Sequence, residues 1–331
     1  MSRIIPVFIP HLGCSHRCVF CDQNAIAAPR APSVREVRDL ICVALPAAQG
    51  GEVAYYGGSF TALAPTLQED YLAIAAEFVR SGALSGVRIS TRPDCVDGQT
   101  LARLARYGVC TVELGAQSMD DSVLLRAGRG HTADDTARAA QLVKAGGFSL
   151  VLQTMCGLPG ETRESAAQTA LRVAQLAPDA VRIYPVCVLR GTALARMTEA
   201  GEYVPLTLEQ GVTYAADMLE VFDAYGIPVI RIGLNPTDTL SGGDVLAGAY
   251  HPALGEMVRS RVLLRRVKAR LDAMDAPQGD ICVSVPRGRL SLLLGQKRCN
   301  AEELRQQYPG IRFSFREQDG QAEPLNITAE P

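Results

Sequence analysis

The run Cys14-Ser-His-Arg-Cys18-Val-Phe-Cys21 directly follows an apolar, β-branched segment at 4–9. Three cysteines on one short loop can supply three thiolates to a [4Fe–4S] cluster and leave the fourth iron without a protein ligand. A cluster needs such an open iron if it is to bind S-adenosylmethionine. A zinc site with His11 or His16 as the fourth ligand is the alternative. Zinc sites usually combine two Cys-x2-Cys or Cys/His pairs, however, and this chain has no second pair of that spacing.

The composition is that of a globular protein with a substantial core. The chain has 331 residues, of which 47% are hydrophobic and 21% charged, enough for one large α/β domain and a small appendage. It has no run of about 18 apolar residues, so we expect no membrane span. Ten cysteines without a basic, apolar leader indicate a reducing compartment, and we expect a cytoplasmic protein.

Positive charge is concentrated near the C-terminus. Residues 259–312 contain twelve Lys or Arg and five Asp or Glu, whereas the net charge of the whole chain is −2. A basic module on an acidic body indicates a polyanionic partner. A charged helix whose arginines pair with the acidic body would give the same count.

Apolar runs alternate with amphipathic stretches through the first 225 residues. Strands are expected at 4–9, 53–56, 87–91, 111–114, 149–155 and 180–185, and helices at 34–48, 66–81, 97–107, 132–145, 162–176 and 207–225. Capping boxes such as Ser33-x-x-Glu36 and Thr66-x-x-Glu69 mark helix starts. Strands that each lead into a helix predict a parallel sheet with right-handed crossovers. We therefore predict an α/β fold, a partial (β/α)6 TIM-like barrel, with its site at the C-terminal ends of the strands.

The rest of the chain predicts a small basic α/β module. After a strand at 228–232 and an irregular loop at 234–248, we expect a helix at 254–274, a strand at 280–285, helices at 287–294 and 300–308, a strand at 311–316 and a frayed tail. The expected division is a barrel at 1–250 and the basic helix with the module at 251–331. The turn 294–300 is similar to a degenerate Gly-x-x-Gly loop of KH modules, which clamps nucleic-acid backbone, with Arg298 or Cys299 in place of the second glycine. A charged turn on a capping element is the alternative.

Candidate site residues follow the predicted strands. Gly57 and Gly58 let the backbone approach a ligand closely. Gln117 is placed to bond a ribose, and an arginine such as Arg129 could pair with a carboxylate. The candidates for catalysis or a substrate pocket are Tyr184 and His251, each of which could instead be structural.

With these motifs assembled, the chain resembles the radical SAM family of the Elongator catalytic subunit, clearly from about 5 to 204. The matching stretches are Cys-x3-Cys-x-aromatic-Cys with Phe20 as the aromatic residue, Gly-Gly-Ser-Phe-Thr (57–61), Thr-Arg-Pro-Asp (91–94), Gly-Ala-Gln-Ser (115–118), Arg-Gly-His-Thr (129–132), Leu-Pro-Gly (158–160) and Arg-Ile-Tyr-Pro (182–185). It is more distantly similar to oxygen-independent coproporphyrinogen oxidases.

The resemblance implies a [4Fe–4S] cluster on Cys14, Cys18 and Cys21 and S-adenosylmethionine beside it. The residues implied to contact that cofactor are Phe20, Gly57, Gly58, Ser59, Ser90, Gln117, Arg129, Gln153 and Cys187. The implied reaction is reductive cleavage of S-adenosylmethionine to a 5′-deoxyadenosyl radical, with the protein orienting the cofactor. A flavodoxin or ferredoxin would donate the electron, and the wobble base of a tRNA would be the substrate.

Two departures limit what the resemblance implies. Ser90 stands where the Elongator subunit has an acidic residue. That subunit also has an acetyltransferase-like domain after its radical domain, whereas only the small basic module follows here, so we expect no use of acetyl-CoA unless a separate protein supplies it. The alternatives are a radical SAM enzyme acting on a small molecule of porphyrinogen type, and a non-catalytic iron–sulfur protein that binds nucleic acid.

Overall fold

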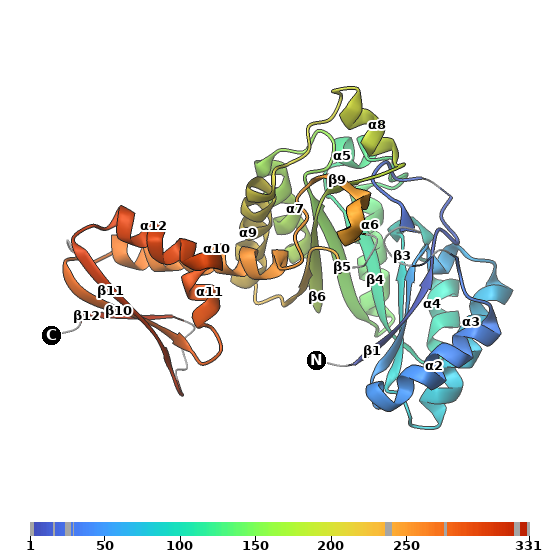
Figure 1. Ribbon diagram of the computed structural model, residues 1–331. Coiled ribbons are helices and arrows are strands. Elements are labelled where there is room, and N and C mark those ends of the chain that lie inside the picture. Colours follow the sequence, from blue (N-terminus) through green and yellow to red (C-terminus); the bar gives the residue numbers. More distant parts are fainter. Residues whose placement is uncertain are drawn as a thin grey trace.

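Seven parallel strands form the main sheet, in the spatial order β1-β2-β3-β4-β5-β6-β8 (Figure 1). The computed structural model describes residues 3–15, 17–23, 28, 30–235, 240–274, 277–320 and 325–329. The strands are β1 (Ile4–Ile9), β2 (Glu52–Gly57), β3 (Gly86–Thr91), β4 (Val109–Gln117), β5 (Ser149–Cys156), β6 (Ala180–Pro185) and β8 (Val229–Ile232). The sheet curls into a half-barrel, which confirms the predicted partial barrel, and the strand expected at 228–232 is β8 at its edge.

Helices cover one face of this sheet. They are α2 (Val34–Ala48), α3 (Pro65–Arg80), α4 (Gly98–Arg106), α6 (Ala133–Ala145), α7 (Arg163–Gln175) and α9 (Leu208–Ala224), while the short α5 (Asp121–Arg126) and α8 (Ala193–Glu199) lie at the C-terminal edge of the strands (Figure 1). Successive side chains of a strand point to opposite faces. Val53, Ile89, Leu114, Leu152 and Ile183 therefore share the helix-covered face, where all five are fully buried.

The helix starts follow local sequence at most of the predicted positions. Ser33 and Glu36 form the predicted capping box of α2, and Thr132 and Thr207 cap α6 and α9 in the same way. The box predicted at Thr66 is wrong. Helix α3 begins one residue earlier at Pro65, whose fixed φ suits the first helical position and whose missing N–H costs no bond there.

Two predicted irregular segments contain short strands. Within the expected loop at 234–248, β9 (Val245–Gly248) pairs with β7 (Cys187–Leu189) in an antiparallel ladder. Within the expected frayed tail, β12 (Asn326–Ala329) pairs with β10 of the C-terminal module. Both segments had few apolar residues to signal a strand, and in each case pairing with a distant partner supplies the backbone hydrogen bonds.

The C-terminal module packs helices on a three-stranded sheet of order β11-β10-β12. Its elements are β10 (Gly279–Pro286), α11 (Leu290–Leu294), a short turn of helix η4 (Gln296–Arg298), α12 (Cys299–Gln307), β11 (Ile311–Gln318) and β12. Strands β10 and β11 are parallel and are connected through α11 and α12. The module has its own apolar core, which includes Val283, Leu293 and Leu304.

Helix α10 (Leu254–Asp272) joins the module to the barrel (Figure 1). Its first half contributes Leu254, Val258 and Val262 to the barrel core, and its second half contributes Leu264 and Val267 to the core of the module. The boundary proposed at residue 250 stays a prediction, because α10 belongs to both cores. In the described part of the chain, no helix combines the length and hydropathy needed to cross a membrane.

One buried amide fixes the start of α12. Asn300 is 4% exposed, and its Nδ2 donates to Ser260 Oγ at 2.9 Å and to Leu293 O at 3.1 Å. Its Oδ1 would lie 2.9 Å from a Cβ placed on Gly295. The side chain therefore connects α10, α11 and α12 at the turn that precedes it.

We expect Asn300→Ala to lower the free energy of unfolding by about 1–3 kcal/mol, because it leaves a buried hydroxyl and carbonyls short of a donor. Urea denaturation followed by circular dichroism measures this. Glu302→Ala, at an exposed position on the same helix, is the control and should change stability by less than about 0.5 kcal/mol. Equal stability of the two variants would contradict this role for Asn300.

Candidate active site at the mouth of the barrel

The cysteine loop connects β1 to α2 and lies against the C-terminal end of β2. Gly58 N donates to Ile9 O at 3.0 Å, and Ser59 N donates to Leu12 O at 2.8 Å. A Cβ on Gly58 would collide with Leu12 O, so only glycine allows this approach. The glycine pair therefore holds the base of the cysteine loop.

The middle of the loop is anchored on the far side of the mouth. Val19 N donates to Ala127 O at 3.0 Å, and Leu194 N donates to Val19 O at 2.8 Å. Phe20 is half-buried and packs against an apolar cluster that includes Val123. The loop is thus tied to both α5 and α8 before α2 begins.

The three thiols are half-exposed, and the surroundings of Cys14 and Cys21 disfavour thiolate charge. Burial and then the neighbouring Cys18 and Cys14 raise the pKa of Cys21 to about 12, and burial and Cys18 raise the pKa of Cys14. The positive charge of Arg129 acts in the opposite direction and lowers the pKa of both thiols. Three thiolates here need bound positive charge, as an iron–sulfur cluster provides.

The donor set suits a cluster better than a single ion. Among the described residues, no three His, Cys, Asp or Glu side chains are gathered to hold one metal ion. The thiolates of a cubane bind separate irons and need not converge on one point. His11 is engaged elsewhere, since its Nε2 accepts a hydrogen bond from Gln23 N at 3.0 Å. His16 lies outside the described residues.

Gln117 and Arg129 meet beside Cys18 at the C-terminal end of β4. Arg129 Nη1 donates to Cys18 Sγ at 3.1 Å, and Nη2 donates to Gly115 O at 2.6 Å. A Cβ on Gly115 would lie 2.9 Å from Gln117 Nε2 and 3.2 Å from Arg129 Nη2, so the glycine makes room for both side chains. The structure thus brings together two of the predicted cofactor residues and one predicted cluster ligand.

Gln117 has an unused acceptor. It is 8% exposed, its backbone is left-handed with φ 65°, and its Oε1 is buried without a hydrogen-bond partner in the described part of the chain. Buried polar atoms nearly always have a partner in a functional complex. A ligand hydroxyl would satisfy this oxygen, as the predicted ribose contact requires.

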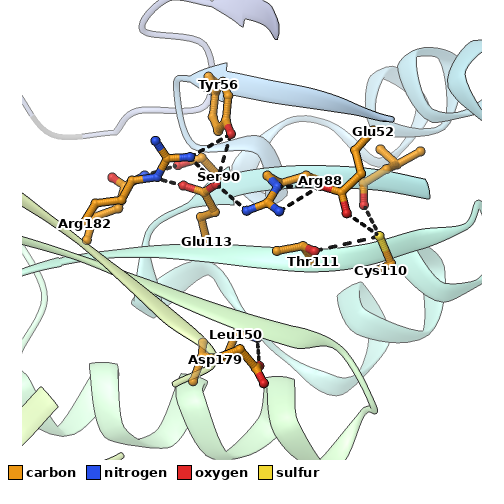
Figure 2. Close-up of polar contacts among 12 residues, drawn as sticks. Glu52, Tyr56, Arg88, Ser90, Cys110, Thr111, Glu113, Leu150, Asp179 and Arg182 are labelled. Carbon is orange, nitrogen blue, oxygen red and sulfur yellow. Dashed lines mark hydrogen bonds and ion pairs between the residues drawn. The ribbon is translucent and has the colours of Figure 1, made fainter. Parts of the chain in front are cut away.

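The concave face of the sheet centres on Glu113, which is fully buried on β4 (Figure 2). Its Oε1 accepts hydrogen bonds from Tyr56 OH at 3.1 Å, Arg88 Nη1 at 3.0 Å and Arg182 Nη2 at 3.0 Å, and its Oε2 accepts one from Gln153 Nε2 at 2.9 Å. Burial alone would raise the pKa of Glu113, but Arg182, Gln153 and Arg88 together hold that pKa below its usual range. Glu113 therefore stays ionised in the folded protein.

Two predicted cofactor residues lie in or beside this network. Gln153 bonds Glu113 and also approaches Ser90 Oγ at 3.5 Å. Ser59 lies outside this network. Its buried hydroxyl forms a hydrogen bond with Thr91 Oγ1 at 3.0 Å and accepts one from Arg92 N at 3.2 Å. Its side chain connects the ends of β2 and β3.

Of the remaining candidates, Tyr184 lies nearest the cysteine loop. It packs against the same apolar cluster as Phe20, and burial raises its pKa. Cys187 is buried on β7 with Leu189 and Leu240, and burial raises its pKa to about 12. His251 Nδ1 accepts a hydrogen bond from Ala253 N at 3.0 Å. This contact is local and lies just before the start of α10.

Comparison with known proteins places the chain in a family. Residues 8–173 match the radical SAM superfamily, and residues 178–263 match the radical SAM C-terminal domain. The chain therefore belongs to the radical SAM superfamily, whose general reaction is cleavage of S-adenosylmethionine at a [4Fe–4S] cluster.

Several curated proteins are similar to parts of the chain. The tRNA uridine(34) acetyltransferase of Methanocaldococcus jannaschii is 35% identical over 38% of this chain and 24% of its own length. Elongator complex protein 3 of Schizosaccharomyces pombe is 30% identical over 56% of this chain and 35% of its own length. Protein YhcC of Escherichia coli is 31% identical over 43% of this chain and 47% of its own length. The chain thus spans less than half the length of these relatives.

Solved structures show the same fold. Elp3 of the archaeon Methanocaldococcus infernus, lacking its N-terminus, superposes with a TM-score of 0.65 at 21% identity over 82% of this chain and 63% of that one. The coproporphyrinogen III oxidase of Escherichia coli superposes with a TM-score of 0.51 at 19% identity, over 68% of this chain and 53% of that one.

We expect Cys18→Ala to abolish the iron–sulfur cluster after anaerobic reconstitution, because two thiolates cannot hold an open-corner cubane. Iron and sulfide analysis with the visible absorption spectrum measures this, and the parent should hold about four irons. Cys42→Ala, at an exposed thiol on α2, is the control and should load fully. Zinc in place of iron in the parent would contradict the assignment.

We expect Glu113→Gln to lower the free energy of unfolding by about 3–5 kcal/mol at neutral pH, because it leaves two buried guanidinium groups poorly compensated. In the parent, the lowered pKa of Glu113 stabilises the folded state above the pKa of a glutamate in the unfolded chain, about 4.3. This stabilisation is lost as the pH falls through the pKa of Glu113 in the folded protein. The free energy of unfolding of the variant should lack this part of the pH dependence. Denaturation curves at several pH values measure it.

Glu77→Gln, which breaks an exposed ion pair with Arg38, is the control and should cost less than about 1 kcal/mol. A Glu113 variant with the stability and acid sensitivity of the parent would contradict the role of this network.

Proposed function

We propose that this chain is a radical SAM enzyme that modifies RNA, with the wobble uridine of a tRNA as the target. The observation that carries the chemistry is the meeting of Gln117 and Arg129 beside Cys18 at the mouth of the barrel. A non-catalytic iron–sulfur protein has no use for an unsatisfied acceptor next to a cluster ligand. The resemblance to tRNA uridine(34) acetyltransferases supports the choice of substrate.

We assign each residue a role toward the cofactors. Cys14, Cys18 and Cys21 would hold the cluster, and the backbone of Gly57 and Gly58 would lie beside the methionine group of S-adenosylmethionine. Gln117 Oε1 would accept a hydrogen bond from the ribose. Arg129 would balance negative charge at Cys18 and the cofactor carboxylate. When bound, these cofactors supply a 5′-deoxyadenosyl radical that removes hydrogen from the substrate.

The polar concave face would receive the substrate. Parallel sheets are usually covered on both faces and apolar throughout. Here Tyr56, Glu113, Gln153 and Arg182 place hydrogen-bonding groups below the mouth. Such groups suit a nucleobase, which offers donors and acceptors on its edge. We place the reaction in the cytoplasm, with a flavodoxin or ferredoxin as electron donor.

Two experiments test this function. Reconstituted protein with dithionite and S-adenosylmethionine should release 5′-deoxyadenosine, measured by liquid chromatography. Nucleoside analysis of tRNA from a deletion strain should show one missing modification at the wobble position. Release of 5′-deoxyadenosine with an unchanged tRNA profile would overturn the RNA substrate and favour a small-molecule reaction.

We expect Gln117→Ala to raise the Kd for S-adenosylmethionine roughly 2- to 10-fold, because it removes one hydrogen bond to the ligand. Isothermal titration calorimetry with the cluster-loaded protein measures this. The iron content should not change, since the side chain donates no ligand to the cluster. Gln175→Ala, at an exposed position on α7, is the control. Equal affinity in both variants would show that Gln117 does not contact the cofactor.

A further inference from the structure

Most of the positive charge of the C-terminal segment is already paired. All six Lys and Arg of α10 have partners, three of them on α9: Arg261 pairs with Glu209 at 2.6 Å, Arg265 with Asp217 at 2.8 Å and Arg266 with Asp223 at 2.6 Å. Lys268 pairs with Glu303, and Arg259 and Arg270 donate to backbone carbonyls. The basic helix therefore binds α9 of the barrel and is not itself the surface for a polyanion.

Two adjacent cations remain free on the turn between α11 and α12. Lys297 and Arg298 are exposed, and neither side chain has an ion pair or hydrogen bond in the described part of the chain. Elsewhere in the module Arg312 pairs with Asp280 at 2.6 Å, and Arg305 lies over the ring of Phe315. The exposed Arg289, between β10 and α11, also has no ion pair or side-chain hydrogen bond among the described residues, so the turn is the place where two such cations are adjacent.

The turn holds two consecutive non-glycine residues in the left-handed conformation. Lys297 has φ 51° and Arg298 has φ 65°, following Gly295 at φ 74°. The left-handed conformation costs a non-glycine residue about 1–2 kcal/mol. Exposed side chains cannot offset that cost by burial. Strain of this kind is concentrated where a chain binds a ligand.

The topology around the turn is similar to that of KH modules. Strand β10, helices α11 and α12 and the parallel strand β11 form a strand–helix–helix–strand unit with the turn 295–298 between its helices. KH modules use a Gly-x-x-Gly turn at that position to clamp the backbone of about four nucleotides. Arg298 replaces the second glycine but keeps a left-handed conformation. In addition, no side chain caps the start of α12.

We propose that the turn 295–298 binds the sugar–phosphate backbone of a single-stranded segment of the RNA substrate. This inference rests on the proposed RNA substrate and adds a second contact to it, outside the mouth of the barrel. Lys297 and Arg298 would contact phosphates, which position the chain without reading its sequence. Because α10 belongs to both cores, it would fix the distance between this contact and the mouth.

The test measures binding of the full, cluster-loaded protein to a fluorescent single-stranded RNA dodecamer at several salt concentrations. Lys297→Glu with Arg298→Glu should raise the Kd at least about tenfold near 0.1 M salt, through loss of two phosphate contacts and added repulsion. Lys297→Gly with Arg298→Gly should lower the slope of log K against log salt by about 1.4, or 0.7 for each lost contact. Glycine also relieves the left-handed strain, so the Tm of this variant should not fall.

The control reverses two exposed arginines on the barrel, Arg35 on α2 and Arg106 on α4, to glutamate. It should keep the dodecamer affinity within about twofold of the parent. A parent that does not bind the dodecamer at low salt, or binding that is indifferent to Lys297 and Arg298, would overturn the inference. So would an equal loss in the control, which would reflect net charge alone.

The outcomes also separate this inference from the proposed function. Dodecamer binding that depends on the turn, with an unchanged tRNA profile in the deletion strain, would support the clamp and overturn the wobble-base substrate. A missing wobble modification, with dodecamer binding indifferent to the turn, would support the substrate and overturn the clamp.

Discussion

The buried carboxylate of Glu113 is the interaction on which the polar half of the sheet depends. Its partners come from four other strands, with Tyr56 on β2, Arg88 on β3, Gln153 on β5 and Arg182 on β6. A charge taken out of water must be matched by partners of opposite charge and by hydrogen bonds. The concave face therefore stays polar and ordered, in contrast to the apolar face under the helices.

Above this network the fold brings three separate segments to one point. The glycine at 58 lets the cysteine loop lie on the end of β2, and the glycine at 115 makes room for Gln117 and Arg129 at the end of β4. In both places the absence of a side chain allows a polar group to come close. The cysteine loop therefore lies against the ends of the parallel strands, on the sheet whose β4 also carries Glu113.

Much of this could be predicted from sequence, because the signals are local. The alternation of strands and helices predicted the sheet, and the spacing of Cys14, Cys18 and Cys21 predicted the cluster ligands that we propose. The Glu113 network was missed because it joins five strands, although polar residues alternate with apolar ones at Arg88 and Ser90 on β3 and at Arg182 and Tyr184 on β6. The count of charged residues likewise could not show that the arginines of α10 form ion pairs with acidic residues of α9, since these partners lie more than 40 residues apart in the sequence.

The most direct test of the central claim is the electron paramagnetic resonance spectrum of the reduced, reconstituted protein with and without S-adenosylmethionine. Three thiolate ligands leave one iron open to this molecule. We expect a [4Fe–4S] signal whose g values change when S-adenosylmethionine is added. A signal that is identical with and without it, or no cluster signal at all, would contradict an open iron at the mouth of the barrel.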